Sequence, residues 1–180
     1  LVTNWEAKNR PYGVLGYNNQ QFTGTPNWDR LREGKSLLFI HGTFSTAAAA
    51  YHGLLEDTAE IKKLEQAYEG RIFAFYHPSL SASPAGNIQE LATLIPDEMR
   101  GQSIDIVTHS RGGLVGRELM AQTQAGTGPG LKVNKAILVA GPHNGTILTN
   151  EKHWVSLLDT YTNLLLKLPD GPVTIILEAI

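Results

Sequence analysis

Short apolar segments alternate with segments of helical periodicity along most of this 180-residue chain, and this alternation limits the fold more than any other feature. The apolar segments are rich in β-branched and aromatic residues, as strands buried on both faces are. They cover residues 36–40, 71–76, 103–108 and 134–140. Because parallel strands need long, right-handed crossovers, this order predicts an α/β protein with a mostly parallel sheet and helices on both faces.

The segments between the predicted strands carry signals for helices. Residues 51–70 place leucine and isoleucine side chains at helical spacing and end at Gly70, which suits a helix C-terminus. Asn87, with Glu90 three residues later, has the pattern of a helix N-cap. The residues that follow Ser110 are again apolar at helical spacing. We therefore expect a helix between each two consecutive strands.

The chain has the length of a single domain. Residues 1–35 are dense in glycine, asparagine and proline, and we expect an N-terminal extension or leading strands there. Residues 36–148 hold the alternating core. In residues 149–180, apolar side chains from Trp154 to Leu168 repeat at three and four positions. This repeat predicts a helix packed on the sheet or, alternatively, a lid-like or cap-like helix.

Composition excludes several classes of function. The net charge of -2 gives no basic surface for nucleic acid. Cysteine is absent, so the chain has no disulfide, thiolate metal site or cysteine nucleophile. No spacing of histidine and carboxylate residues resembles a metal site, and we expect no metal and no other cofactor. The apolar stretches are shorter than a membrane span, which predicts a soluble domain without an integral membrane segment.

The two ends of the chain carry a separate expectation. The sequence begins at Leu1 rather than at methionine, has no signal-peptide pattern, and ends on an apolar segment at Ile180. We therefore expect a trimmed or processed chain that was cut from something longer. The sequence leaves the compartment open, and a bacterial cytoplasm is the expectation if the protein is intracellular.

A polar segment follows each predicted strand, and the functional crevice of a parallel sheet lies beyond the carboxyl ends of its strands. In residues 104–115, IDIVTHSRGGLV, the strand runs into Ser110 and then at once into Gly112 and Gly113. A serine on such a sharp strand-to-helix turn presents its hydroxyl at the rim of the sheet. The N–H of Arg111 lies at the helix N-terminus, where it can stabilise an oxyanion. Ser110 is therefore the candidate nucleophile.

Three motifs occur in order on successive predicted strands: LLFIHGTF, THSRGG and AGPHNGT. Together they resemble the α/β-hydrolase superfamily, especially its bacterial lipases and esterases. The resemblance covers the alternating core and implies a fold of this type that is truncated at its C-terminus. It implies that Ser110 is the nucleophile and that the backbone N–H groups of Thr43 and Arg111 form the oxyanion hole, next to Phe44. The usual elbow is G-x-S-x-G, and Thr108 stands here in place of its first glycine.

The resemblance leaves the base and the acid of the catalytic triad open. The superfamily has the order serine, acid, histidine, and the last two follow later strands than the ones found here. His143, after the last clear strand, and His153, at the start of the next predicted helix, are the candidates for the base. Asp105 precedes Ser110 along an extended strand by about 16 Å, which excludes it as the acid. We expect the acid and histidine to lie in a missing C-terminal part or a partner chain, or to be replaced.

The other histidines have structural interpretations. His41 ends its strand, and the resemblance implies that it supports the following loop through hydrogen bonds. We expect His77 to be a loop residue and His52 to face solvent. His109 precedes the candidate nucleophile, and adjacent residues at a strand end point apart. None of these four is expected to act as the base.

These residues predict a serine hydrolase that cleaves carboxylic esters, of a lipid or another acyl group, through an acyl-enzyme on Ser110. Phe44, Trp154 and Leu158 are the candidates for contact with a small-molecule ester or lipid substrate. The alternative is a catalytically inert or truncated hydrolase-like module that binds an apolar ligand or a protein partner. Acyltransferase and peptidase chemistry on the same turn stay open, because a fold does not choose the reaction.

Overall fold

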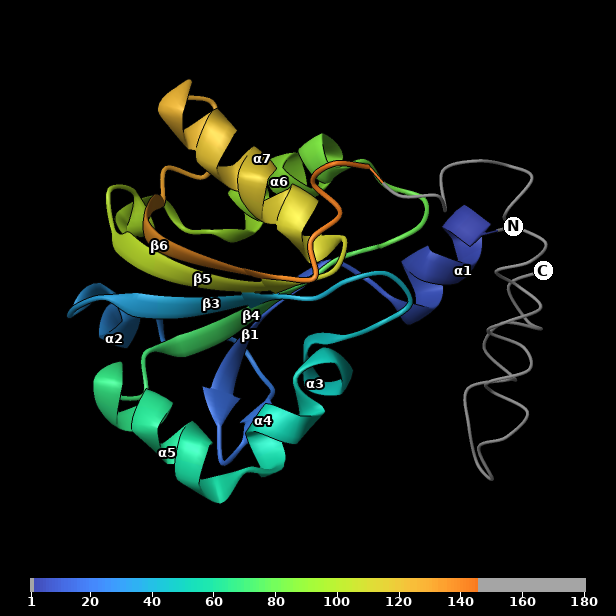
Figure 1. The fold of residues 1–180 in the computed structure, drawn as a ribbon. Coiled ribbons are helices and arrows are strands. Elements are labelled where there is room, and N and C mark those ends of the chain that lie inside the picture. Colours follow the sequence, from blue (N-terminus) through green and yellow to red (C-terminus); the bar gives the residue numbers. More distant parts are fainter. Residues whose placement is uncertain (1, 146–180) are drawn as a thin grey trace, which may run out of the picture.

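The computed structural model describes residues 2–145, and it confirms the predicted α/β class (Figure 1). The strands are β1 (Gly13–Asn18), β2 (Gln21–Phe22), β3 (Ser36–Ile40), β4 (Ile72–Tyr76), β5 (Ser103–His109) and β6 (Lys132–Val139). The helices are α1 (Val2–Asn9), α2 (Trp28–Arg32), α3 (Ala47–Ala50), α4 (His52–Glu56), α5 (Thr58–Ala67), α6 (Pro84–Leu94) and α7 (Gly112–Gln124), with a 3-10 turn at Asp97–Met99. The four segments predicted as strands correspond to β3, β4, β5 and β6.

The strands form one sheet in the order β2-β1-β4-β3-β5-β6. The strands from β3 to β6 are parallel, whereas β1 is antiparallel to both β4 and β2. The sheet is therefore mostly parallel, as predicted. The parallel strands end at one edge of the sheet, and Ile40 of β3 pairs with Thr108 of β5. This register places the loop after β3 next to the loop after β5.

Apolar side chains alternate between the two faces of the sheet, because successive residues of a strand point to opposite sides. In β3, Leu38 and Ile40 belong to the cluster that includes residues of α6 and α7, while Leu37 and Phe39 belong to the cluster that includes residues of α3, α4 and α5. Figure 1 shows the two groups of helices on opposite faces. Burial on both faces explains why β3 is apolar along its whole length.

The prediction of one helix over residues 51–70 is wrong, because the segment divides into α4 and α5. Asp57 lies between them with an extended backbone, and its carboxylate accepts hydrogen bonds from the N–H groups of Ala59 and Glu60. Such a side chain satisfies the free N–H groups of a first helical turn and starts a new helix.

The predicted N-cap of the next helix is also wrong. Helix α6 begins after Ser83, whose hydroxyl accepts the Gly86 N–H at 3.0 Å, and Pro84 occupies the first helical turn. Proline is favoured there because its missing N–H would have no helical partner. Asn87 instead lies inside α6 and is fully buried.

Strand β6 is the edge strand in the part of the chain that the structure describes. Ile137 is 60% exposed and Val139 is 46% exposed. The prediction that this segment is buried on both faces is therefore wrong for the described structure, because only β5 pairs with it. The predicted lid or packing helix in residues 149–180 lies outside the described residues. Among residues 2–145, no helix is long and apolar enough to cross a membrane.

Helix α7 starts against the ends of two strands. A Cβ atom on Gly112 would lie 2.5 Å from the carbonyl oxygens of both Ile40 and His41. One turn later, a Cβ atom on Gly116 would lie 2.9 Å from the Cγ2 methyl of Thr108. No side chain fits at such distances, so these glycines allow α7 to pack directly on β3 and β5.

We expect Gly112→Ala to lower the free energy of unfolding by about 1–3 kcal/mol, because α7 must move away from the carbonyl oxygens of β3. Gly53→Ala is the matched control: Gly53 also lies in a helix, and no atom lies within 4 Å of the Cβ position. There, alanine should leave stability unchanged or raise it by up to about 1 kcal/mol. Urea unfolding of the two variants measures the difference, and equal stabilities would contradict the close packing of α7.

Candidate active site

Ser110 lies on the turn between β5 and α7 in the left-handed backbone region, with a φ angle of 54°. Its N–H donates to the Val139 carbonyl at 2.8 Å, and its carbonyl accepts the Gly113 N–H at 2.9 Å. A positive φ angle strains a residue other than glycine by about 1–3 kcal/mol, and such residues cluster at functional sites. The two hydrogen bonds hold this strained serine, which is half-buried, at the carboxyl end of β5.

The loop that follows β3 closes on Ser110 through Gly42. A Cβ atom on Gly42 would lie 2.8 Å from the Cβ atom of Ser110 and 3.3 Å from its hydroxyl oxygen. The same atom would lie 2.8 Å from the His109 carbonyl oxygen. Only glycine allows the two loops to approach this closely. The structure thus brings together the HGTF and HSRGG segments that the sequence analysis selected.

Two backbone N–H groups on the residues that follow Gly42 and Ser110 have no described hydrogen-bond acceptor. Among the described residues, neither the Thr43 N–H nor the Arg111 N–H has a hydrogen-bond acceptor. Thr43 follows Gly42 directly, and Arg111 follows Ser110. The next N–H along the loop, that of Phe44, donates instead to the Ser79 hydroxyl at 3.0 Å. The geometry therefore distinguishes Thr43 from Phe44 as a donor to a bound oxyanion.

Phe44 is the one predicted substrate-contacting residue that the structure describes, since Trp154 and Leu158 lie outside residues 2–145. Phe44 has a φ angle of 54°, and its side chain is 43% exposed. It borders a small cavity of about 20 Å³ between α1 and the loops after β3 and β4, which Trp5 and Leu80 also line. The exposed ring places apolar surface on the loop that also carries Thr43.

His143 lies against the first turn of α7. Its Nε2 atom is 2.4 Å from a Cβ position on Gly141 and 3.1 Å from one on Gly113. Both ring nitrogens are buried and have no hydrogen-bond partner among the described residues. No described carboxylate therefore orients this ring, although the ring lies close to the Ser110 turn. His153, the other candidate base, lies outside the described residues.

His41 and His77 form a buried stacked pair, with ring centroids 4.2 Å apart. They stand at the start of the loops after β3 and β4. The backbone N–H of His77 donates to Nε2 of His41 at 3.3 Å, and Nδ1 of His41 contacts the Gly42 carbonyl at 2.9 Å. His41 is thus a neutral ring that supports the following loop, as the sequence analysis predicted. Burial lowers the pKa of His41 to about 4, and burial and the neighbouring His41 lower the pKa of His77 to about 3.

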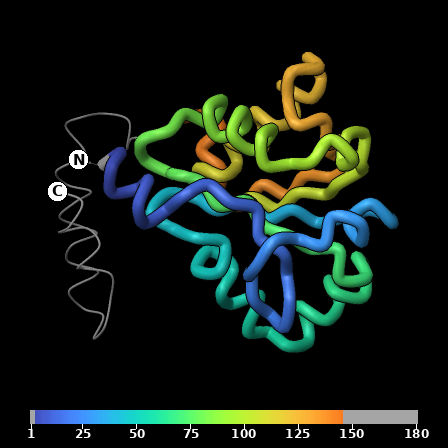
Figure 2. Tube along the Cα trace, turned by 180° about the vertical axis from the view of Figure 1, so that it is seen from behind, coloured from blue at the N-terminus to red at the C-terminus, as the bar shows by residue number. Residues whose placement is uncertain are grey.

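Glu6 is a buried residue near the site that the sequence analysis missed. It lies on α1, which Figures 1 and 2 show beside the loops at the carboxyl ends of β3 and β4. Its side chain is 1% exposed and accepts hydrogen bonds from the loop formed by residues 79–81. Burial raises its pKa, but the hydrogen bonds from this loop outweigh burial and hold the pKa below its ordinary value. No local pattern marks Glu6, because its partners lie more than 70 residues away along the chain.

Asp105 has a structural role at the other end of β5. Its carboxylate accepts hydrogen bonds from the Tyr68 hydroxyl at 2.7 Å and the Asn134 amide at 3.0 Å, and it pairs with Lys35 at 3.2 Å. Burial raises the pKa of this carboxyl, but the hydrogen bonds and Lys35 bring it below its ordinary value. All its contacts lie away from Ser110, in agreement with its exclusion as the triad acid.

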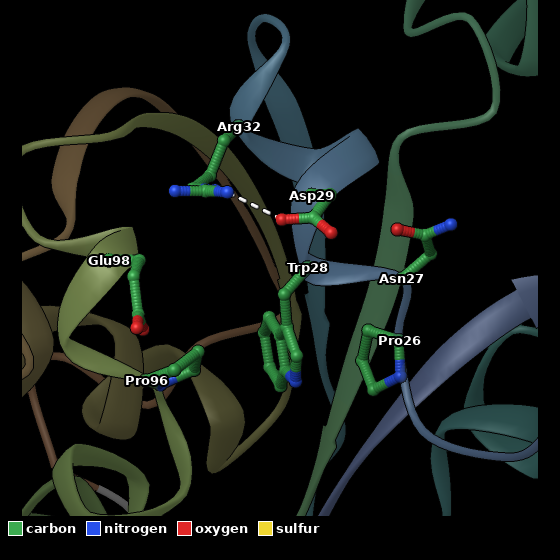
Figure 3. Close-up of a pocket in the computed structure, with 7 residues that line it drawn as sticks. All are labelled: Pro26, Asn27, Trp28, Asp29, Arg32, Pro96 and Glu98. Carbon is green, nitrogen blue, oxygen red and sulfur yellow. Dashed lines mark hydrogen bonds and ion pairs between the residues drawn. The ribbon is translucent and has the colours of Figure 1, made fainter.

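A cavity of about 410 Å³ lies away from this site (Figure 3). It is lined by Pro26, Asn27, Trp28, Asp29, Arg32, Pro96 and Glu98. These residues precede β3 and β5, so the cavity lies at the amino ends of the strands. Figure 3 shows the Trp28 ring between Pro26 and Pro96, while Arg32 pairs with Asp29. Within residues 2–145, no group of three or more histidines and acidic residues could hold a metal ion.

The fold and this site describe an α/β protein with a half-buried serine on a strand-to-helix turn. A family described as a domain of unknown function, DUF7379, matches residues 10–180. The chain therefore belongs to the DUF7379 family. No curated protein matches the sequence. The matched residues include Ser110 and both of its neighbouring loops, whereas α1 and Glu6 precede them.

The stacked histidines make stability depend on pH. Between pH 6.5 and about pH 4 the unfolded chain protonates His41 and His77, while the folded protein keeps both neutral, because burial lowers their pKa values to about 4 and about 3. Stability is therefore fully present above pH 6.5 and falls as the pH is lowered. We expect a loss of about 2 kcal/mol per histidine between pH 7 and pH 5. Glu6 and Asp105 have ordinary pKa values of 4.5 and 3.8, so they contribute mainly below this range.

Urea unfolding at successive pH values measures this loss. His41→Gln should remove about half of it, because one of the two buried neutral rings is then absent. A free energy of unfolding that stays constant from pH 7 to pH 5 would contradict the burial of a neutral histidine pair.

Proposed function

We propose that this protein is a serine hydrolase of the α/β-hydrolase type that cleaves carboxylic esters. The observation that carries the proposal is the strained backbone of Ser110, on the turn between β5 and α7, next to two N–H groups without a described acceptor. A nucleophilic serine in this superfamily lies on such a turn, and its oxyanion hole combines the following N–H with one from the loop after β3. Arg111 and Thr43 occupy these two positions.

The reaction proceeds through an acyl-enzyme. The Ser110 hydroxyl attacks the ester carbonyl and gives its proton to a base, and the tetrahedral oxyanion accepts hydrogen bonds from the N–H groups of Thr43 and Arg111. The alcohol leaves with the proton from the base. Water then attacks the acyl-enzyme, releases the carboxylic acid and returns the proton to Ser110.

Two residues are proposed as the base. His143 lies beside the Ser110 turn with both ring nitrogens free of described partners, and His153 follows later in the chain. The acid that would orient either ring is proposed to lie beyond residues 2–145 or on a partner chain. His41 is a poor base, because burial lowers its pKa to about 4 and both of its ring nitrogens have backbone partners.

The proposed substrates are esters with an apolar acyl group, of a lipid or another molecule. The exposed Phe44 ring supports this choice, since it lies on the loop that also provides Thr43. Trp154 and Leu158 are proposed to extend the apolar surface. Acyltransferase or peptidase chemistry would use the same nucleophile and the same oxyanion hole.

A second function is proposed from the exposed apolar edge of the sheet. Ile137, Leu138 and Val139 of β6 are all exposed in the described structure, and an open apolar edge strand is a site for pairing or docking. A hydrolase-like module without a working triad would bind an apolar ligand or a protein partner there. The two proposals differ in whether Ser110 is an activated nucleophile.

We expect a fluorophosphonate probe to label the wild-type protein on Ser110 with one group per chain, because the probe reacts with activated serines. Ser110→Ala should abolish labelling, whereas Ser103→Ala, which removes an exposed hydroxyl from the start of β5, should have no effect. Intact-protein mass spectrometry measures the added mass. Folded wild-type protein that stays unlabelled would overturn the hydrolase proposal and favour the binding module.

We expect Gly42→Ala to slow labelling of Ser110 by about 10²-fold, because the new methyl group pushes the loop of Thr43 away from the serine. Gly13→Ala is the control, since no atom lies within 4 Å of a Cβ position at Gly13. Labelling rates are compared at equal protein concentration, after circular dichroism has shown that both variants are folded. Equal rates would show that the contact between Gly42 and Ser110 does not set the reactivity of the serine.

A further inference from the structure

Helix α1 contributes a buried carboxylate to loops at the candidate site, although α1 lies outside the residues that match the family. Glu6 accepts N–H groups from Ser79 at 2.6 Å, Leu80 at 3.0 Å and Ser81 at 2.7 Å, and the Ser81 hydroxyl at 2.6 Å. Hydrogen bonds to an ionised carboxylate are among the strong ones in proteins. Glu6 therefore fixes the backbone of residues 79–81.

Ser79 connects this fixed loop to the loop that carries Thr43. Its hydroxyl oxygen accepts the Phe44 N–H at 3.0 Å, and the hydroxyl itself donates to Oε1 of Glu6 over a longer distance of 3.5 Å. These contacts form a chain from the carboxylate through Ser79 to the backbone of Phe44. Phe44 needs such a restraint, because its positive φ angle persists only when surrounding contacts hold it.

Arg111 holds the same loop from the other side. Its guanidinium donates to the carbonyl of Ala82, immediately after the residues that contact Glu6. The loop after β4 is therefore tied to α1 through its N–H groups and to the residue after Ser110 through a carbonyl. The first tie ends on Glu6, and the second ends on Arg111, whose backbone N–H is a proposed oxyanion donor.

We propose that Glu6 is a positioning residue, which holds the Thr43–Phe44 backbone next to Ser110 through Ser79. The positioning of this backbone by Glu6 does not depend on the proposed function. Only the role of the backbone in binding an oxyanion rests on that function. Without the carboxylate, the Ser79 hydroxyl loses its orientation and the Phe44 N–H loses a fixed acceptor. The strained loop then relaxes, and the Thr43 N–H moves away from the oxygen that it would stabilise.

The direct test measures amide hydrogen exchange by NMR in Glu6→Gln, which replaces one carboxylate oxygen by a donor. We expect the amides of Ser81 and Phe44 to exchange at least about tenfold faster, because a hydrogen bond to a charged group is lost. The amide of Arg30, which donates to the Asn27 side chain at the other end of the sheet, is the internal reference.

Glu65→Gln is the matched control, because Glu65 also accepts a side-chain hydrogen bond, from Tyr17 at 2.8 Å, far from these loops. It should leave the Phe44 amide unchanged. Glu6→Asp keeps the charge on a shorter side chain and should give an intermediate exchange rate. This variant keeps the test valid if Glu6→Gln does not fold.

A double-mutant cycle separates positioning through Ser79 from a general role in stability. Ser79→Ala removes the acceptor of the Phe44 N–H but leaves the backbone N–H bonds to Glu6 in place. If Glu6 acts through Ser79, the double variant Glu6→Gln/Ser79→Ala should exchange the Phe44 amide no faster than Ser79→Ala alone. Additive effects on this amide, or no effect of Glu6→Gln on it, would overturn the inference.

Fluorophosphonate labelling of the same variants distinguishes this inference from the proposed function. We expect Glu6→Gln to slow labelling of Ser110 by about tenfold. If the exchange pattern appears but the wild-type protein is not labelled, the hydrolase proposal fails and the positioning of the loop by Glu6 stands. If the wild type is labelled and Glu6→Gln leaves both the labelling rate and the Phe44 amide unchanged, the inference fails and the hydrolase proposal stands.

Discussion

Close contacts at two glycines hold the ends of β3 and β5 together. Gly112 brings α7 against the carbonyl oxygens of Ile40 and His41, and Gly42 brings the loop after β3 against Ser110. A Cβ atom at either glycine would separate these segments, because backbone atoms fill the space at Gly112, and the His109 carbonyl and the Ser110 side chain fill it at Gly42. Ser110 and the two proposed N–H donors, Thr43 and Arg111, lie on these segments or directly beside them. The site therefore exists only as long as both close approaches are kept.

The strands could be predicted from the sequence because their signal is local. Leu37 to Ile40 are all apolar since β3 is buried on both faces, and the parallel order of the sheet followed from the helical segments between strands. Helix starts were less certain, because Ser83 and Asn87 are both capping residue types. Pro84, directly after Ser83, was the available signal, since proline is favoured in a first helical turn.

Thr108 shows how a local departure from a motif can be accommodated by a residue further along the chain. A side chain at this position of the elbow crowds the turn. The sequence around Thr108 does not show which part of the chain makes room for it. In the structure the threonine is fully buried, and its methyl group lies against Gly116 on α7. The missing glycine before the serine is thus matched by a glycine on the helix after it. Sequence spacing cannot reveal such a pair unless the helix is first placed on the strand.

Three ionisable side chains, those of Glu6, His41 and His77, are buried beside the loops of the candidate site. A buried carboxylate is stable at Glu6 because three backbone N–H groups face it, whereas buried His41 and His77 are stable because they stay neutral. The loops beside Ser110 are thus supported by one charged group and two uncharged rings, each of which hydrogen-bonds to the backbone. Under the proposed mechanism these groups orient the backbone donors, and the proton of Ser110 must pass to a histidine without such partners. Neither ring nitrogen of His143 has a partner among the described residues, and its ring lies against the first turn of α7.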